Sequence, residues 1–313
     1  MKKRKKIIIG SRGSKLALIQ ANWVKSQLEE ANKEIEIVIE TIKTTGDKIT
    51  DVPLAKIGNI GLFTKELENA LLEKKVDLVV HSAKDMPTEI PESLEIGAIT
   101  ERKDPHDVLI SKGDLALRDL PQNAKIGTSS LRRIAQLLAF RPDLTTVDLR
   151  GNLDTRLKKL ESDELDAIIV ARAGLLRLDL ADKASEIIPY DIMLPAVGQG
   201  ALCIEIRDID EDIKEVISIL NHHETMYAVK AERVLLAKLQ GGCQVPIGAL
   251  AEIVFPVNLK LEAVVCSLDG STILRNSFTG KVDDFVDIGH GLAHKLSDMG
   301  GNKILEEIRK KLA

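Results

Sequence analysis

The sequence of 313 residues is poor in aromatic residues and carries almost no net charge. Aromatic residues make up 3% of the chain, and 44 lysines and arginines against 48 aspartates and glutamates leave a formal net charge of −4. Nucleic-acid-binding proteins usually have a basic face with stacking aromatic rings. The composition therefore argues against a nucleic-acid partner, and only the basic run at residues 2–6 keeps a DNA-binding regulator as a minor alternative.

Cysteine is also scarce. The three cysteines, Cys203, Cys243 and Cys266, are an odd number in a long chain, unlike the dense, even set of a disulfide-stapled secreted domain. A reducing compartment fits this usage best. The sequence has no CxxC pair and no cluster of cysteine and histidine, so we predict no metal site.

Long apolar runs are missing as well. No run approaches the roughly 20 residues of a transmembrane helix, and only Ile7, Ile8 and Ile9 separate the basic start from Gly10, which is too short for a signal peptide. We therefore predict a cytoplasmic protein without a membrane partner. Hydrophobic residues at 44% and charged residues at 29% are ordinary for a globular chain, whose length suggests two or three domains.

Short apolar runs alternate with helical periodicity through the first two thirds of the chain. The expected strands are 7–9, 35–39, 77–80, 125–127, 145–149, 167–170 and 201–206, and the expected helices include 17–28, 65–74, 131–140 and 153–160. This alternation is typical of parallel βαβ units and predicts two doubly wound α/β domains. The strand at 201–206 is expected to return the chain to the first domain.

The last third has a different pattern. A helix at 224–239 precedes strands at 249–253, 260–266 and 272–277, the last two joined by a hairpin at Asp269-Gly270, and helices at 284–299 and 303–312 follow. This order predicts a small α+β domain. The predicted boundaries are 1–100 plus 200–219 for the first domain, 105–195 for the second and 222–313 for the third.

Arginine is concentrated in one part of the chain, since seven of the 15 arginines lie between residues 132 and 177. Arginine suits the bidentate recognition of carboxylates and phosphates. Four loops that follow predicted strands carry hydroxyl or basic groups, at 11–14, 82–85, 128–133 and 150–156, and such loops bind ligands in α/β sheets. We predict an anion-binding cleft, while simple helix capping remains the alternative for each loop.

Two of these arginines occupy an unfavourable place. Arg132 and Arg133 lie in the first helical turn after a predicted Ser130 cap, where positive charge opposes the helix dipole and costs a few tenths of a kcal/mol unless an anion compensates. That cost favours a functional role for them. The aperiodic loop at 44–61 is longer than the roughly 15 residues usual for a connection, so it is either functional or disordered.

Several separated motifs resemble those of the porphobilinogen deaminase family, also called hydroxymethylbilane synthases. The motifs are VHSAKDMP at 80–87, GTSSLRR at 127–133, LRGN at 149–152 with TRL at 155–157, PAVGQGA at 195–201, LNHHET at 220–225 and QGGCQVP at 240–246. They occur in the family's order and span nearly the whole chain.

The resemblance implies a monomeric transferase of tetrapyrrole and heme biosynthesis, with two periplasmic-binding-protein-like domains and a small C-terminal domain. It implies that Cys243 carries a covalent dipyrromethane cofactor. It also implies that Asp85 is the catalytic carboxylate, which stabilises the cation formed when porphobilinogen loses ammonia. Four porphobilinogen units are then joined head to tail and released as hydroxymethylbilane.

The resemblance also implies a set of polar residues that bind the carboxylates of cofactor and substrate or line the cleft. These residues are Arg12, Ser14, Gln20, Ser82, Lys84, Thr128, Ser129, Ser130, Arg132, Arg133, Arg150, Arg156, Arg177 and Gln199. Lys56 and Phe63 would belong to a lid loop, in which Ile60 stands where the family usually has lysine. That departure motivates an alternative function, a non-catalytic two-lobed anion-binding protein of the same fold.

Overall fold

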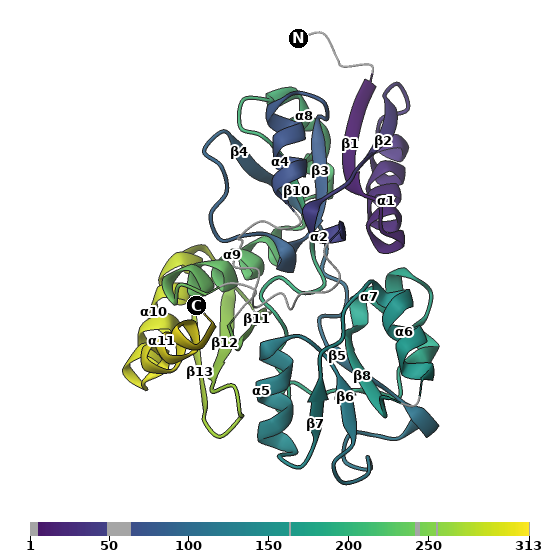
Figure 1. Ribbon diagram of the computed structural model, residues 1–313. Coiled ribbons are helices and arrows are strands. Elements are labelled where there is room, and N and C mark those ends of the chain that lie inside the picture. The colour runs from purple at the N-terminus through teal and green to yellow at the C-terminus, as the bar shows by residue number, and fades with distance from the viewer. Residues whose placement is uncertain (1–5, 49–63, 163, 242–244, 255, 313) are drawn as a thin grey trace. The chain divides into compact units, whose positions relative to one another are not determined.

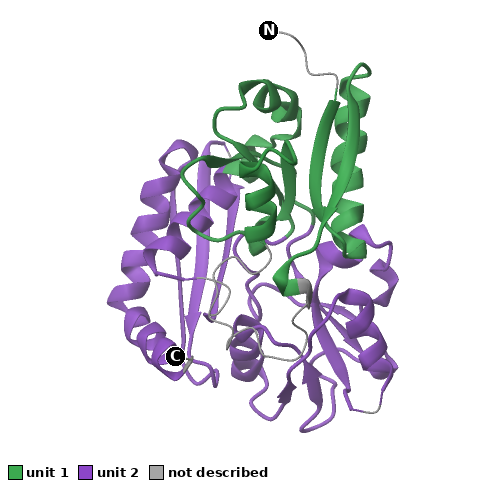
Figure 2. Ribbon diagram, turned by 45° about the horizontal axis from the view of Figure 1, so that its top comes forward, with its two compact units in different colours: residues 1–50, 59–103, 200–226 green, residues 51–58, 104–199, 227–313 purple. Residues whose placement is uncertain are grey.

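The computed structural model describes residues 6–48, 64–162, 164–241, 245–254 and 256–312 (Figure 1). They divide into two compact units (Figure 2). Unit 1 contains the described residues up to 48, residues 64–103 and residues 200–226. Unit 2 contains the described residues of 104–199 and 227–312.

Unit 1 is built on a five-stranded mixed sheet with the order β2-β1-β3-β10-β4. Its strands are β1 (Lys6–Arg12), β2 (Glu36–Ile42), β3 (Leu78–Ser82), β4 (Leu94–Ile99) and β10 (Leu202–Arg207). Strand β1 runs parallel to both β2 and β3, whereas β10 pairs antiparallel with β3 and β4. The predicted return of the chain to the first sheet is confirmed, and β4, which was not predicted, forms the sheet's edge.

Helices cover both faces of this sheet (Figure 1). They are α1 (Lys15–Ala31), the short α2 (Thr45–Lys48), α4 (Lys65–Leu72) and α8 (Glu211–Ile217), with one-turn 3-10 helices η1 (Ala83–Asp85) and η4 (Ser218–Leu220). Because side chains alternate along a strand, Leu78 and Val80 pack with residues of α1, while Val79 packs with Leu67 and Leu71 of α4. The two faces of the sheet thus have separate cores.

Unit 2 contains a second five-stranded mixed sheet with the order β7-β6-β8-β5-β9. Its elements are β5 (Asp107–Ser111), η2 (Lys112–Asp114), β6 (Lys125–Gly127), α5 (Leu131–Phe140), β7 (Thr145–Val147), α6 (Leu153–Glu161), β8 (Ala167–Ala171), α7 (Arg172–Arg177), η3 (Ala181–Lys183) and β9 (Glu186–Ile187). Strand β6 is parallel to β7 and β8, and β5 is antiparallel to β8 and β9. The α/β class is confirmed, although each sheet also has antiparallel strands that the pattern did not predict.

Unit 2 also holds a three-stranded antiparallel sheet with the order β11-β12-β13. Its strands are β11 (Ile247–Val254), β12 (Asn258–Cys266) and β13 (Ile273–Lys281), and its helices are α9 (His223–Lys238), η5 (Val282–Asp284), α10 (Phe285–Asp298) and α11 (Gly301–Leu312). Gly270, with φ of +71°, lies in the turn between β12 and β13, as the hairpin prediction required. This part is the predicted small α+β domain.

The predicted second and third domains therefore lie in one unit with separate sheets, and the three-domain boundaries stay a prediction. Among the described residues, every helix is too short or too polar to cross a membrane.

Candidate functional site

In unit 1, predicted site residues gather where β1 and β3 end. Arg12 is the last residue of β1, and Ser82 is the last residue of β3, followed at once by Lys84 and Asp85 in η1. Neighbouring parallel strands place their carboxyl ends at the same edge of a sheet. The Ala83 amide donates to Ala201 O at 3.0 Å, which fixes this turn on β10. Asp85 is exposed, so its carboxylate is accessible at this edge.

Two further residues of unit 1 support the same edge. Gln20, buried in α1, donates from Nε2 to Ser82 Oγ at 3.2 Å and so links the helix to the end of β3. Ser14 is the N-cap of α1, and its hydroxyl accepts from the Ala17 amide at 3.3 Å. Ser14 therefore caps a helix, which was the alternative interpretation of this loop, and its contact with a ligand stays a prediction.

In unit 2, the loop Thr128-Ser129-Ser130 follows β6 and leads into α5. Ser129 Oγ donates to Leu149 O at 2.8 Å and accepts from the Leu149 amide at 3.0 Å, which ties this loop to the segment after β7. Ser130 occupies the N-cap position of α5, but its side chain makes no capping hydrogen bond with the described residues, so its predicted capping is wrong. Thr128 is buried, and its hydroxyl accepts from the Ser130 amide at 3.3 Å.

Arg132 and Arg133 are buried around one carboxylate, Asp107 of β5. Arg132 Nη1 lies 2.5 Å from Asp107 Oδ2, and Arg133 Nη2 and Nε lie 2.7 and 3.1 Å from Oδ1. Each guanidinium also donates to a backbone oxygen, that of Leu194 or Ile169. The anion that compensates two positive charges in the first turn of α5 is thus part of the protein itself.

Asp107 was not among the predicted site residues. Burial alone would raise the pKa of its carboxyl, but the adjacent guanidinium groups of Arg132 and Arg133 hold that pKa far below its usual range. Gln199 joins the network, since its Nε2 donates to Asp107 Oδ1 at 3.0 Å and to Pro105 O at 2.7 Å. The sequence feature that could have indicated Asp107 is a charged residue directly before the apolar residues 108–110.

Arg150 has a different environment from this pair. It lies after β7, and its Nε and Nη2 are buried without a hydrogen-bond partner among the residues that the structure describes. A buried, unsatisfied charged donor costs at least about 1–3 kcal/mol. These two nitrogens of Arg150 therefore lack an acceptor within the part of the chain that the structure describes.

Two more arginines lie after the same set of parallel strands. Arg156, in α6, donates from Nε to Gly151 O at 3.0 Å. Arg177 ends α7, and burial lowers the pKa of its guanidinium to about 10, so it remains a cation at neutral pH.

The predicted attachment residue Cys243 and the predicted lid residues Lys56 and Phe63 lie outside the described residues. The chain just before Cys243 is well anchored, because Arg309 Nη2 of α11 donates to Leu239 O at 2.8 Å and to Gln240 O at 3.0 Å. A Cβ on Gly241 would lie 2.4 Å from Leu236 Cδ1. A larger residue at this position would therefore have to displace the side chain of Leu236.

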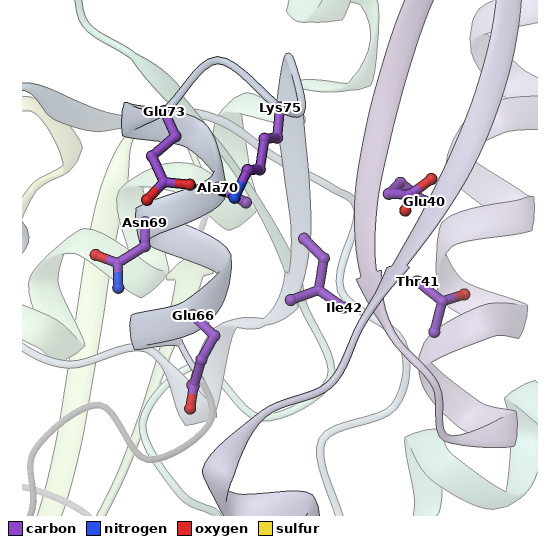
Figure 3. A pocket seen from close by; sticks show the side chains of 8 residues that line it. All are labelled: Glu40, Thr41, Ile42, Glu66, Asn69, Ala70, Glu73 and Lys75. Carbon is purple, nitrogen blue, oxygen red and sulfur yellow. Dashed lines mark ion pairs between the residues drawn. The ribbon is translucent and has the colours of Figure 1, made fainter.

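A cavity of about 610 Å³ in unit 1 does not coincide with these residues (Figure 3). It is lined by Glu40, Thr41, Ile42, Glu66, Asn69, Ala70, Glu73 and Lys75. Three glutamates and one lysine give the lining a negative balance, which disfavours a ligand rich in carboxylates. None of the predicted site residues lines this cavity.

Two family models match the chain. One, described as porphobilinogen deaminase, dipyromethane cofactor binding domain, matches residues 7–215, and another, described as porphobilinogen deaminase, C-terminal domain, matches residues 226–298. Among solved structures, the periplasmic aliphatic sulphonate binding protein SsuA from Escherichia coli has a TM-score of 0.41 and 13% identity, with 75% of this chain and 71% of that chain covered.

Curated relatives named porphobilinogen deaminase match over almost their whole length. The protein from Desulforamulus reducens is 54% identical over 304 residues, which cover 97% of this chain and 98% of the relative. The protein from Carboxydothermus hydrogenoformans is 52% identical, with 98% of each chain covered. The protein from Chlorobium chlorochromatii is 51% identical, with 98% of this chain and 99% of the relative covered.

Proposed function

Because the chain belongs to the porphobilinogen deaminase family, we propose that it is the transferase that joins four porphobilinogen molecules head to tail and releases hydroxymethylbilane and ammonia. The family model over residues 7–215 is that of a dipyrromethane cofactor binding domain. We further propose porphobilinogen as the small-molecule partner, which the family supports. A monomeric state and a cytoplasmic location rest on the sequence alone and stay predictions.

The observation that carries the proposal is the unsatisfied guanidinium of Arg150. Porphobilinogen units carry acetate and propionate groups, and a dipyrromethane carries the same groups twice. The two buried Arg150 nitrogens without a partner among the described residues match such a carboxylate, and Arg156 and Arg177 add positive charge after the neighbouring strands. The residues present therefore fit a polycarboxylate cofactor.

We assign the binding roles by unit. In unit 2, Arg150, Arg156 and Arg177, with the Ser129-Ser130 loop, would hold carboxylates of cofactor and substrate, and in unit 1 Arg12 and Lys84 would do the same. Cys243 would attach the cofactor, which would supply the pyrrole carbon onto which the first unit is added. Gln20, Ser82 and Gln199 would orient the neighbouring backbone through the hydrogen bonds described above.

Asp85 would act on the reacting porphobilinogen. Its exposed carboxylate, held on the turn after β3, can accept hydrogen bonds from pyrrole N–H groups. When ammonia leaves, positive charge develops on the porphobilinogen, and a fixed carboxylate stabilises that charge more in the transition state than in the ground state. Lys84, the neighbouring cation, would bind a substrate carboxylate.

The mass of the purified chain tests this proposal directly. We expect the intact mass to exceed the mass of the 313-residue sequence by one dipyrromethane, and we expect porphobilinogen to be consumed. Cys243→Ser is expected to remove the added mass and the turnover, while the matched change Cys203→Ser, in a buried strand, leaves the adduct in place. A wild-type chain that binds carboxylates without an adduct or turnover would instead be the non-catalytic anion-binding protein.

Arg150→Gln should weaken catalysis without weakening the fold. The substitution removes a charged donor pair that makes no hydrogen bond with the described residues, so we expect no loss of thermal stability. Loss of a charged hydrogen bond costs roughly 2 kcal/mol, so kcat/KM for porphobilinogen should fall about 30-fold. The control is Arg118→Gln, since Arg118 is exposed and packs over the ring of Phe140. Equal kcat/KM values in both variants would remove Arg150 from the site.

A further inference from the structure

A buried carboxylate of unit 2, that of Glu232 in α9, joins two segments that are far apart in the sequence. The side chain of Glu232 is fully buried. Its Oε2 accepts from the Gly198 amide at 2.7 Å, and its Oε1 accepts from the Ala251 amide at 2.8 Å. Hydrogen bonds from backbone amides to a carboxylate are about twice as strong as those between neutral groups. Glu232 therefore ties the backbone at Gly198 to strand β11.

Strand β11, which contains Ala251, forms one edge of the three-stranded sheet. The outward amides of an edge strand need acceptors from outside the sheet. The Ala249 amide donates to Pro195 O at 2.9 Å. Two residues further on, the Ala251 amide donates to Glu232. Glu232 therefore extends the contact between this edge and the chain that follows Pro195.

The chain that follows Pro195 forms a tight turn. The Gln199 amide donates to Ala196 O at 2.9 Å, and Gly198, the third residue of this turn, has a φ of +73°. A positive φ at the third residue is typical of a type II turn, which differs from a type I turn in the orientation of its central peptide. The N–H of that central peptide belongs to Gly198, and the turn's own hydrogen bond does not use it. Because Glu232 accepts from this N–H, its carboxylate fixes the orientation of the turn.

The turn ends at Gln199, whose side chain is buried in unit 2. Gln199 Nε2 donates to Asp107 Oδ1 at 3.0 Å. Asp107 also accepts from Arg132 and Arg133, which lie in the first turn of α5. A change in the orientation of the turn would withdraw Gln199 from Asp107. It would thereby loosen the start of α5 and the loop that precedes it.

We propose that Glu232 is a positioning residue for the binding of substrate carboxylates. It holds the turn at 196–199 in the form in which Gln199 reaches Asp107, and through Asp107 it fixes the loop before α5. This role in carboxylate binding rests on the proposed function, in which the Ser129-Ser130 loop binds carboxylates. The link from Glu232 to Gln199 does not, because it depends only on the hydrogen bonds around the turn.

The variant Glu232→Met tests this link separately from activity. Methionine has nearly the length of glutamate, but its thioether is only a weak acceptor, so the Gly198 and Ala251 amides both lose their partner. Glu252→Met, at the exposed position next to Ala251, is the matched control. If Glu232→Met does not fold, Gly198→Ala alters the same turn, because a side chain is strained at a φ of +73°.

Hydrogen exchange of the holoprotein, followed by NMR, measures the link. Relative to the Leu261 amide of the central strand β12, we expect the Gly198 amide to exchange at least about tenfold faster in Glu232→Met than in the wild type and in Glu252→Met. The side-chain amide of Gln199 should exchange faster as well, because the turn no longer directs it. Faster exchange at Gly198 with unchanged exchange at Gln199 would overturn the link.

Steady-state kinetics with porphobilinogen test the positioning role. We expect KM to rise about tenfold in Glu232→Met, the effect of about one charged hydrogen bond, and kcat to stay within about threefold of the wild-type value. The chemical step is spared because Asp85 lies in unit 1, outside this network. Gly198→Ala should show the same rise in KM. A lower kcat with an unchanged KM would show only a loss of folded enzyme and would overturn the positioning role.

A double-mutant cycle tests whether Glu232 acts through Gln199. We expect Gln199→Leu to raise KM, and the addition of Glu232→Met, or of Gly198→Ala, to raise it no further. Independent effects that multiply to about a hundredfold would overturn the proposal. A wild-type chain without turnover would refute the proposed function, and the exchange rates of Gly198 and Gln199 would still decide the link.

Discussion

Asp107→Ala is expected to lower the free energy of unfolding by about 3–5 kcal/mol, because it leaves two buried guanidinium groups without their counter-charge. Asp107 is fully buried, and Arg132 and Arg133 are each about 95% buried. Their desolvation is offset by the charge of Asp107 and by hydrogen bonds to Leu194 O and Ile169 O. Without the carboxylate, two like charges would remain in a site that water does not reach.

Chemical denaturation of the holoprotein measures this loss. The matched control is Asp143→Ala, because Asp143 also pairs bidentately with one arginine, Arg141, at 2.7 and 2.8 Å, but in a partly exposed position. Solvent screening makes such a pair weak, so the loss should be far smaller. Similar stabilities of the two variants would contradict a charge-neutralising role for Asp107.

The same network predicts how stability responds to acid. The pKa of Asp107 is lower in the folded state than in the unfolded state. The ionised carboxylate therefore adds to the free energy of unfolding when the pH is above the pKa of an unfolded aspartate, and this stabilisation is lost as the pH falls below about 4. Asp107→Ala should therefore differ most from the wild type near neutral pH and converge with it in strong acid. A difference that stays constant down to pH 2 would point to lost packing and not to charge.

This network also changes what is expected of Arg132 and Arg133. From the sequence alone, their unfavourable place in the first turn of a helix favoured a functional role for both arginines. Since both side chains are buried and bonded to Asp107, we now expect a folding cost as well. Any contact of these arginines with a ligand carboxylate stays a prediction, and such a carboxylate would compete with Asp107.

Local patterns predicted several of the regular elements with accurate bounds. Strand 125–127 and helix 131–140 have the predicted bounds, and Asn152 caps α6 through the Thr155 amide at 2.9 Å. Strands β4, β5 and β9 were not predicted. Strand β4 pairs with β10 and β5 pairs with β8, and each of these partners is more than 50 residues away in the sequence. Strand β9 then pairs with β5 at the edge of the sheet.

In the candidate site, too, residues that local patterns identify differ from residues that depend on distant partners. Loops after parallel strands could be identified from turn residues and basic residues, and the structure places Arg12, Asp85, Ser129 and Arg150 at such strand ends. Asp107 could not be identified in this way, because its partners are 25 and 26 residues away and a single aspartate in a strand carries no periodic signal. Local sequence patterns do not indicate ion pairs between residues that are far apart in the sequence.

Asp85→Asn is expected to lower kcat by at least a hundredfold to a thousandfold, the loss usual when one preorganised electrostatic group is removed from a transition state. Asparagine has the same shape and still accepts a hydrogen bond, so substrate binding should change little. What it lacks is the negative charge that would stabilise the cation formed as ammonia leaves. The loss should therefore appear in kcat, with KM nearly unchanged.

The position of Asp85 separates an effect on catalysis from an effect on folding. Its side chain is exposed on a one-turn helix whose backbone is held by the Ala83–Ala201 hydrogen bond, so neither the fold nor the turn depends on its charge. Glu89→Gln, an exposed carboxylate four residues later, serves as the control and should retain turnover. Ammonia release in single-turnover experiments follows the step itself, and intact mass counts the units added to the chain. If Asp85→Asn keeps its thermal stability and releases ammonia within tenfold of the wild-type rate, Asp85 does not stabilise the developing cation, and another carboxylate must do so.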